Sequence, residues 1–295
     1  MKIFIFGSSG LLGSKLMEIR NKEFEVMGAD VNPFPNSNKS NVLMLDATDR
    51  DNVFKQLQKY KPDVVINAIN IPSVDFCEDN IQEARKIIVD TTKNMLDACG
   101  KNIKLVFLSS DYIFDGKNGP YSENDIPNAT NNYGSLKLEG EKLVLNSNPQ
   151  NLVVRTTILY GWHTSRKPNY ALWTIDQLRK GNRISVVTDQ YGTPTLANDL
   201  ADAILKLLES KKNGIYHVVG RDLINRFDFT KKIAKVFQLD SSLVLPITSD
   251  QFDQKASRGK KLGLRTDKIQ KELKIKLSGV DEGLRRMRSE MINNG

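Results

Sequence analysis

Cysteine and histidine are scarce in this chain, and long hydrophobic runs are missing. The 295 residues include two cysteines and two histidines, and Cys77, Cys99, His163 and His217 stand far apart without the spacing of metal ligands or redox pairs. The sequence therefore predicts no metal site, no disulfide framework and no histidine nucleophile. No segment approaches the roughly 20 apolar residues of a membrane span. We expect a cytoplasmic protein without a membrane partner.

Aromatic residues are also few, at 7% of the chain, and they are not interleaved with the basic residues. The formal net charge is +8, but lysine and arginine form only small clusters, at Lys211-Lys212, Lys231-Lys232 and Arg258 to Lys261. A nucleic-acid site needs a basic surface with aromatic side chains that stack on bases, so nucleic acid is not an expected partner. The positive surplus favours small anions such as dinucleotides and sugar nucleotides.

Short apolar runs alternate with helical patterns through the first half of the chain. Parallel strands that are covered on both faces read as continuous apolar runs. The alternation therefore predicts an α/β fold with a doubly wound parallel sheet, the Rossmann fold. The expected strands are Lys2–Phe6, Glu25–Ala29, Val42–Leu45, Asp63–Asn67, Ile103–Leu108 and Leu152–Arg155, and the expected helices are Leu11–Arg20, Asp49–Lys59, Asn80–Cys99 and Asn131–Leu145.

After Arg155 the pattern becomes mixed and is interrupted by prolines. We expect a dinucleotide-binding domain over residues 1–160, joined by about 188–219, and a smaller substrate-binding lobe from 161–187 and 220–295. Ile215–Val219 is expected to return to the main sheet as an added strand. Ligands of open α/β sheets bind beyond the carboxyl ends of the strands, so the site is expected between the two parts. Further helices are expected at Tyr170–Arg179, Ala197–Leu208, Arg226–Phe237, Thr266–Leu273 and Gly279–Met291.

A glycine-rich turn, Gly7–Gly13, follows the first expected strand with the spacing G-x-x-G-x-x-G. Gly7 permits a tight turn, Gly10 lets the backbone approach a pyrophosphate, and Gly13 lets the following helix pack on the sheet. The amide groups that open this helix then face the anion along the helix dipole. The turn predicts a dinucleotide site. Its expected contacts are Gly7, Ser9, Gly10, Leu11, Leu12 and Gly13.

Asp30 stands at the end of the second expected strand. A carboxylate there accepts hydrogen bonds from the adenosine ribose and repels a 2′-phosphate, which favours NADH over NADPH. Two observations keep NADPH open: Asp30 can instead cap the turn at Asn32-Pro33, and Lys39 is near enough in sequence to bind a phosphate. The ends of the third and fourth strands are expected to add cofactor contacts from Asp46, Ala47, Asn67, Ala68 and Ile69.

Tyr133 and Lys137 lie one helical turn apart. Reduction of a ketone needs a proton on the oxygen, and a lysine on the same helix face stabilises the phenolate that remains. Tyr133 can then act as general acid in reduction and general base in oxidation. Lys137 is also expected to bind the nicotinamide ribose, and Ser110 to hold the substrate oxygen. The alternative is a surface helix with a packed Tyr133 and a solvated Lys137, which the pair alone would favour.

Longer motifs surround these residues. With them the chain resembles, over essentially its whole length, the dTDP-4-dehydrorhamnose reductase family of the extended short-chain dehydrogenase/reductase superfamily. The segments that carry the resemblance are Leu108–Gly116 (LSSDYIFDG), Pro120-Tyr121, Glu123–Asp125, Asn132–Gly134, Lys137-Leu138, Gly140–Lys142, Asp189–Thr195 (DQYGTPT), Asp199–Ile204 and Gly214–His217.

The resemblance implies reduction, by NADH or NADPH, of the C4 ketone of a nucleotide-diphospho-4-keto-6-deoxysugar, as in dTDP-rhamnose biosynthesis. It implies catalytic roles for Ser110, Tyr133 and Lys137, with Tyr133 as the proton donor. It also implies substrate binding by Asp111, Tyr112, Gln190 and Arg258. Asp111 has an alternative role as a loop residue that binds nearby amides.

Two positions depart from the family pattern. Ile158 stands where rhamnose-forming members usually have tryptophan, and Gly259 replaces the proline that commonly follows the arginine matched to Arg258. The identity of the sugar is therefore open. The chain also resembles the regulatory β subunit of methionine adenosyltransferase, which keeps the fold and dinucleotide site while serving a partner enzyme. A sugar-nucleotide epimerase or dehydratase is the third candidate. The sequence does not fix the oligomeric state, and a homodimer is compatible with it.

Overall fold

A seven-stranded parallel sheet forms the centre of the computed structural model, which describes residues 1–18, 23–33, 41–71, 73–163 and 168–294. Every neighbouring pair of strands is parallel. The central order 3-2-1-4-5-6 is that of a dinucleotide-binding doubly wound sheet, which confirms the predicted fold class. In spatial order the strands are β11 (Gly214–His217), β6 (Leu152–Thr156), β5 (Lys104–Ser110), β4 (Val64–Asn67), β1 (Lys2–Phe6), β2 (Glu25–Asp30) and β3 (Val42–Met44).

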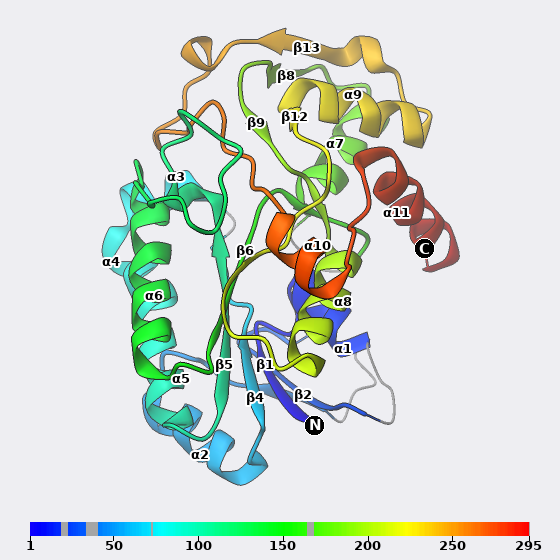
Figure 1. Cartoon of the computed structure of the whole chain (residues 1–295). Helices are drawn as coiled ribbons and strands as arrows, with labels where there is room; N and C mark the ends of the chain where they lie inside the picture. The colour runs from blue at the N-terminus through cyan, green and yellow to red at the C-terminus, as the bar shows by residue number, and fades with distance from the viewer. Residues whose placement is uncertain (19–22, 34–40, 72, 164–167, 295) are drawn as a thin grey trace.

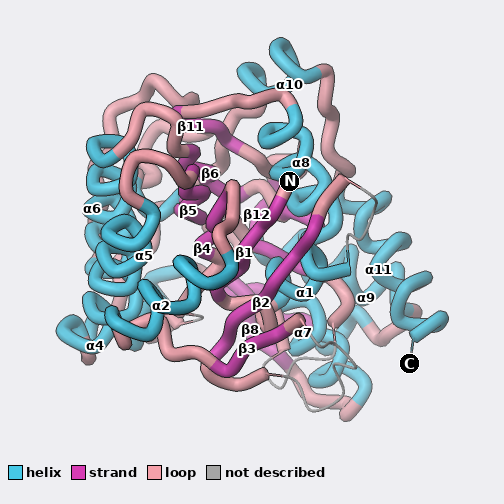
Figure 2. The backbone as a smooth tube through the Cα atoms, turned by 90° about the horizontal axis from the view of Figure 1, so that it is seen from below, coloured by secondary structure: helices cyan, strands magenta, loops and turns pink. Residues whose placement is uncertain are grey.

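Helices cover both faces of this sheet (Figures 1 and 2). Successive residues of a strand point to opposite faces, and β1 supplies both layers in this way: Ile3 and Ile5 pack with one group of helices, and Phe4 and Phe6 with the other. Burial of such side chains stabilises the fold by roughly 1.5–3 kcal/mol each. The first group is α1 (Leu11–Glu18), α8 (Ala197–Glu209) and α10 (Asp267–Leu273), and the second is α2 (Arg50–Tyr60), α5 (Thr91–Cys99) and α6 (Asn132–Ser147).

The helix expected over Asn80–Cys99 is present but not uniform. It runs through α4 (Ile81–Arg85), a π-helical turn (Lys86–Asp90) and α5. A further short helix, α3 (Val74–Asp79), was not expected from the sequence. It begins where the Ser73 side chain accepts a hydrogen bond from the Phe76 amide at 3.2 Å, and six residues are too few to show a helical period.

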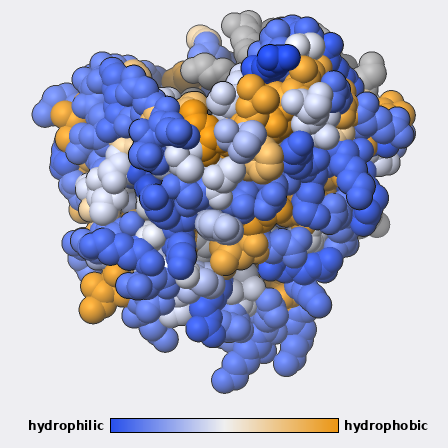
Figure 3. Space-filling model, turned by 90° about the horizontal axis from the view of Figure 1, so that it is seen from above, coloured by the Kyte–Doolittle hydropathy of each residue, from blue (hydrophilic) through white to orange (hydrophobic). Residues whose placement is uncertain are grey.

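A second group of elements lies beyond the carboxyl ends of the central strands (Figure 1). Its core includes Tyr160, Ile175, Phe229 and Leu284. On the surface seen from the side of this second group, hydrophilic residues cover most of the molecule and hydrophobic ones form separate groups (Figure 3). The elements are α7 (Tyr170–Arg179), α9 (Arg226–Phe237) and α11 (Val280–Asn294), with the paired strands β8 (Ile184–Val187) and β13 (Val244–Ile247), β7 (Leu159–Tyr160) and β10 (Thr195–Leu196), and β9 (Tyr191–Gly192) and β12 (Ile224–Asn225).

The returning strand expected at Ile215–Val219 is β11, which pairs in parallel with β6 at the edge of the main sheet. Turns of 3-10 helix lie at Asp111–Ile113, Ser241–Leu243 and Ser249–Gln251 in the described residues. Within the described ranges, no helix is both long enough and apolar enough to cross a membrane.

Candidate active site

The glycine-rich turn joins β1 to α1 and has little room for side chains. Gly7 has a φ of +77°, and a Cβ there would lie 2.9 Å from the carbonyl carbon of Ala68. A Cβ on Gly13 would lie 2.1 Å from the Gly7 oxygen, so this glycine lets α1 approach the turn. Gly10, in contrast, is exposed, and a Cβ on it would meet only the Gly7 oxygen, at 3.3 Å. The amino terminus of α1 is therefore open to an anion, which fits a dinucleotide pyrophosphate.

Asp30 ends β2 beside this turn. Its Oδ2 accepts a hydrogen bond from the Ser9 amide at 3.0 Å, and its Oδ1 accepts one from the Asn32 amide at 3.0 Å. The carboxylate thus fixes the glycine-rich turn and also caps the turn at Asn32, the alternative considered from the sequence. A carboxylate at this place, at the end of the second strand and beside the glycine-rich turn, suits a group that faces an adenosine ribose. Lys39, the alternative phosphate partner, lies outside the described residues.

The other expected cofactor residues stand at strand ends, as predicted. Asn67 ends β4 and is buried: its amide donates to Thr92 at 3.0 Å and its oxygen accepts from the Ile69 amide at 3.1 Å. Asn67 therefore shapes the segment that passes beside Gly7. Asp46 is exposed and accepts two hydrogen bonds from Thr48, each at 2.8 Å. This arrangement orders the turn after β3 and leaves the Asp46 carboxylate at the surface.

Ser110, Tyr133 and Lys137 come together at the carboxyl end of β5 and the first turns of α6. All three are buried, and Lys137 is only 2% exposed, so the alternative of a solvated lysine is wrong. The Lys137 Nζ donates to the Leu108 oxygen at 2.9 Å and lies 5.8 Å from the centre of the Tyr133 ring. Asn131 caps α6 by accepting a hydrogen bond from the Gly134 amide at 2.8 Å.

Burial sets the electrostatics of this cluster. It raises the pKa of Tyr133 well above the ordinary phenol range, and the negative charge of Asp111 acts in the same direction. The hydroxyl of Ser110, which can donate to the phenolate, opposes that rise in the pKa of Tyr133. Burial also lowers the pKa of Lys137 to about 8. Lys137 is therefore still mostly protonated at neutral pH, and its positive charge lies close to the phenol ring.

Asp111 is held inside the site by two hydroxyls. Its Oδ2 accepts from Thr157 at 2.6 Å, and its Oδ1 accepts from Ser110 at 3.0 Å. The Ser110 oxygen in turn accepts from the Tyr112 amide at 3.2 Å. Burial raises the pKa of Asp111, and the positive charge of Arg226 opposes the rise. The hydroxyl hydrogen of Ser110 thus points toward Asp111, and the Ser110 oxygen keeps a lone pair for another donor.

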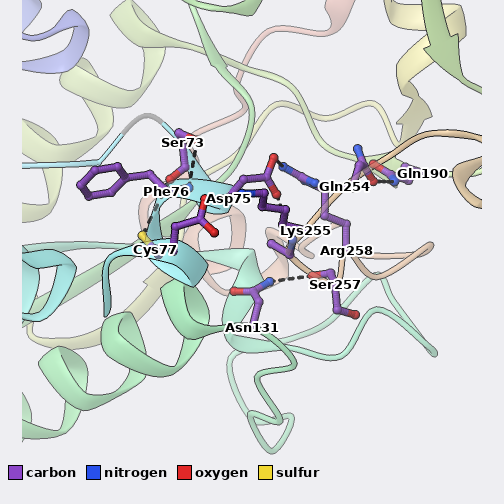
Figure 4. A network of polar contacts seen from close by, with 12 residues as sticks. Ser73, Asp75, Phe76, Cys77, Asn131, Gln190, Gln254, Lys255, Ser257 and Arg258 are labelled. Atoms are coloured by element: carbon purple, nitrogen blue, oxygen red, sulfur yellow. Dashed lines mark hydrogen bonds and ion pairs between the residues drawn. The ribbon is translucent and has the colours of Figure 1, made fainter. Parts of the chain in front are cut away.

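The expected substrate residues Gln190 and Arg258 lie in a network of polar contacts (Figure 4). Arg258 forms an ion pair with Asp75 of α3 at 2.9 Å. Burial raises the pKa of Tyr112, and the charge of Arg258 together with a hydrogen bond from it opposes this rise. The Gln190 amide donates to Gln254 at 2.8 Å and to Ser249 at 3.0 Å.

The same network joins distant parts of the chain. The Asn131 side chain donates to the Ser257 oxygen at 2.8 Å, so the cap of α6 is tied to the segment that carries Arg258 (Figure 4). The Asp75 carboxylate also accepts from the Ala256 amide at 2.9 Å. This segment therefore closes over α3 and α6, and it brings Arg258 to Tyr112 from 146 positions away along the chain, as the numbering shows.

Two residues at the site were missed from the sequence. Asn70, in the loop after β4, accepts the hydroxyl hydrogen of Tyr133 at 2.8 Å. Arg226 stands at the start of α9, and its guanidinium carbon lies 5.1 Å from the centre of the Tyr170 ring. Its positive charge opposes the rise that burial causes in the pKa of Asp111 and in the pKa of Tyr112. Neither belongs to a motif. Their only sequence signal is a position after a strand or at a helix start, which many surface residues share.

Ile158, the departure from the family pattern, has a φ of +44°. A β-branched residue rarely adopts this conformation, which costs of order 1–3 kcal/mol. The Ile158 oxygen accepts from the Thr195 amide at 3.2 Å, which helps to hold the strained turn between β6 and β7. In the described part of the chain, no three His, Cys, Asp or Glu side chains gather as a metal site would require.

Known proteins are similar to this chain in both sequence and fold. The model of the RmlD substrate binding domain family matches residues 1–293. A probable low-salt glycan biosynthesis reductase, Agl14, of Haloferax volcanii is 31% identical over 278 residues, which cover 92% of each chain. The methionine adenosyltransferase 2 subunit beta of Danio rerio is 28% identical over 279 residues, or 91% of this chain and 84% of that protein.

A solved structure shows the same architecture. The dTDP-4-dehydrorhamnose reductase of Bacillus anthracis, crystallised in complex with NADP, superposes with a TM-score of 0.89 at 29% identity, covering 98% of this chain and 99% of that chain. The family match spans almost the whole sequence, and the glycine-rich turn and the Ser-Tyr-Lys cluster occupy one edge of the sheet. This chain belongs to the RmlD substrate binding domain family.

Proposed function

We propose that this protein is an NAD(P)-dependent oxidoreductase that reduces the C4 ketone of a nucleotide-diphospho-4-keto-6-deoxysugar. The observation that carries the proposal is the burial of Tyr133 and Lys137 on one face of α6 next to Ser110. A buried phenol beside a buried cation suits proton transfer, because the cation can stabilise the phenolate. Burial of a lysine would not be expected on a solvated surface helix. The reductases among the relatives support the same class of reaction.

The dinucleotide would lie across the glycine-rich turn. The amides at the start of α1, near Leu11 and Leu12, would face its pyrophosphate, and Asp30 its adenosine ribose. Asp46 and Ala47 would lie near the adenine, and Asn67, Ala68 and Ile69 beside the middle of the cofactor. The charge of Asp30 favours NADH, and a relative with bound NADP keeps NADPH as the second cofactor to be tested.

When bound, the reduced nicotinamide would supply a hydride to carbon 4 of the sugar. The residues of this chain manage the proton. Ser110 donates a hydrogen bond to the ketone oxygen and holds it near the phenol, after its hydrogen turns from Asp111. Tyr133 then gives its proton to that oxygen as the negative charge develops there. The ammonium group of Lys137 stabilises the phenolate and binds the nicotinamide ribose.

The substrate would enter from the side of the second group of elements. We propose that Asp111 and Tyr112 contact the sugar, and that Gln190 and Arg258 line the rest of the cleft, with Arg258 facing the diphosphate. Arg258 forms a hydrogen bond with the Tyr112 hydroxyl, which supports this placement. Accordingly, residues 1–160 with 188–219 would bind the dinucleotide, and 161–187 with 220–295 the sugar nucleotide.

The test is turnover by the pure protein. It is mixed with NADH or NADPH and with dTDP-4-keto-6-deoxyhexose freshly epimerised at C3 and C5, and the loss of nicotinamide absorbance is followed. We expect turnover that falls at least 1,000-fold in Tyr133→Phe while the affinity for the cofactor is retained, since the removed hydroxyl is the proton donor. Tyr60→Phe is the matched control, because Tyr60 binds the Glu25 oxygen, far from the site. Equal turnover by both variants would refute the proposed mechanism.

A regulatory role is the second candidate, favoured by the methionine adenosyltransferase relative at 28% identity. It predicts that the protein binds dinucleotide, turns over no keto sugar, and elutes together with a methionine adenosyltransferase catalytic subunit in size-exclusion chromatography. An epimerase or dehydratase instead predicts NAD that stays bound through purification. Turnover that needs added reduced cofactor would exclude both alternatives as the main function.

A further inference from the structure

Asn70 lies three residues beyond the end of β4, at the same edge of the sheet as Ser110. Its side chain is exposed, whereas its partner Tyr133 is buried. The Tyr133 hydroxyl donates to Asn70 Oδ1 at 2.8 Å. The phenolic oxygen therefore stands at the boundary between the core and the open side of the site, and Asn70 contacts it from the open side.

We propose that Asn70 is a positioning residue that keeps a hydrogen bond to the Tyr133 oxygen in both of its protonation states; this inference rests on the proposed reductase function. An amide carries an acceptor oxygen and a donor NH2 on one planar group, and a half-turn about the Cβ–Cγ bond exchanges them. The neutral phenol donates to Oδ1. After Tyr133 has lost its proton, Nδ2 donates to the phenolate.

The protons and electrons balance in this step. The O–H bond of Tyr133 breaks and an O–H bond forms on the C4 oxygen, while the hydride from reduced nicotinamide forms the new C–H bond at C4. The ketone is reduced to the alcohol and the nicotinamide is oxidised. Asn70 takes up no proton and only turns its amide.

Asn70 is the residue to which the Tyr133 hydroxyl donates, while Ser110 and Lys137 donate elsewhere in this structure. The Ser110 hydroxyl hydrogen points to Asp111, and the Lys137 ammonium donates to the Leu108 oxygen. In the described part of the chain, the Asn70 Nδ2 has no hydrogen-bond partner. Because the side chain is exposed, no packed neighbour has to move when the amide turns.

Two variants test the inference against a matched control. Asn70→Ala removes both hydrogen bonds, and we expect kcat to fall about tenfold with KM changed less than about twofold. Asn70→Asp places a carboxylate beside the phenol, which disfavours the phenolate and raises the pKa of Tyr133. It also leaves no donor for the phenolate, so kcat should fall at least as far as in Asn70→Ala, with KM again changed less than about twofold. Asn102→Asp makes the same change of charge on an exposed residue before β5, at the amino ends of the strands, and should leave kcat and KM unchanged.

The possible results separate the two hypotheses. Unchanged kcat in Asn70→Ala or in Asn70→Asp would overturn the role of Asn70 alone, provided that Tyr133→Phe is inactive. Absence of turnover by the unmodified protein, or full turnover by Tyr133→Phe, would overturn the proposed function and this inference together. Circular dichroism verifies that the exposed substitutions leave the fold intact.

Discussion

Lys137 should make the free energy of unfolding rise with pH, whereas a lysine in an ion pair makes it fall. Its pKa falls from the ordinary 10.5 to about 8 because the ammonium group is buried. Between these two values the unfolded chain binds more protons than the folded one, so stability rises with pH through that window. The charged form costs the folded state about 3 kcal/mol at pH 7, by 1.36 kcal/mol per unit, and about 2 kcal/mol of this is recovered by pH 9.5.

The comparison with Lys137→Met isolates this contribution, because methionine has similar length and no charge. Urea unfolding of both proteins at pH 7 and pH 9.5 gives four free energies of unfolding. We expect the stability of the unmodified protein, relative to Lys137→Met, to increase by about 2 kcal/mol between the two pH values. The same difference at both pH values would refute the reasoning, and would mean that water or the Leu108 carbonyl keeps the buried ammonium group fully stabilised.

Two more predictions concern the pair behind the site and the choice of cofactor. Arg155 and Glu141 form a two-bonded ion pair, at 2.9 and 2.7 Å, with each side chain only 2% exposed. Glu141→Gln should therefore cost about 3–5 kcal/mol in urea unfolding, and Glu141→Leu with Arg155→Met should restore most of it; a single variant with unchanged stability would contradict this. Asp30→Asn keeps an acceptor for the Ser9 amide and removes the charge, so the ratio of NADPH to NADH affinity should rise at least tenfold. Fluorescence titration of both cofactors measures that ratio, and an unchanged ratio would show that Asp30 does not select between them.

The strands of the sheet and the positions of the motifs could be predicted from the amino-acid sequence. Apolar runs such as Lys2–Phe6 and Leu152–Arg155 are strands because they must be buried on both faces, and the structure has them as β1 and β6. The glycines at positions 7 and 13 can be predicted for a similar reason, since a Cβ on Gly7 would lie 2.9 Å from the Ala68 carbonyl carbon and one on Gly13 would lie 2.1 Å from the Gly7 oxygen. These constraints are local, and local constraints leave a mark in the sequence.

The contacts between side chains at the site, in contrast, depend on how the chain folds in space. Asn70 reaches Tyr133, and Arg258 reaches both Asp75 and Tyr112, only because crossovers bring separate loops to one edge of the sheet. Burial, too, became visible only in the fold: nothing in the spacing of Tyr133 and Lys137 distinguishes a solvated pair from a buried one. The chemistry of the pair depends on that difference, because removal of water shifts both pKa values and lets one charge act on the other.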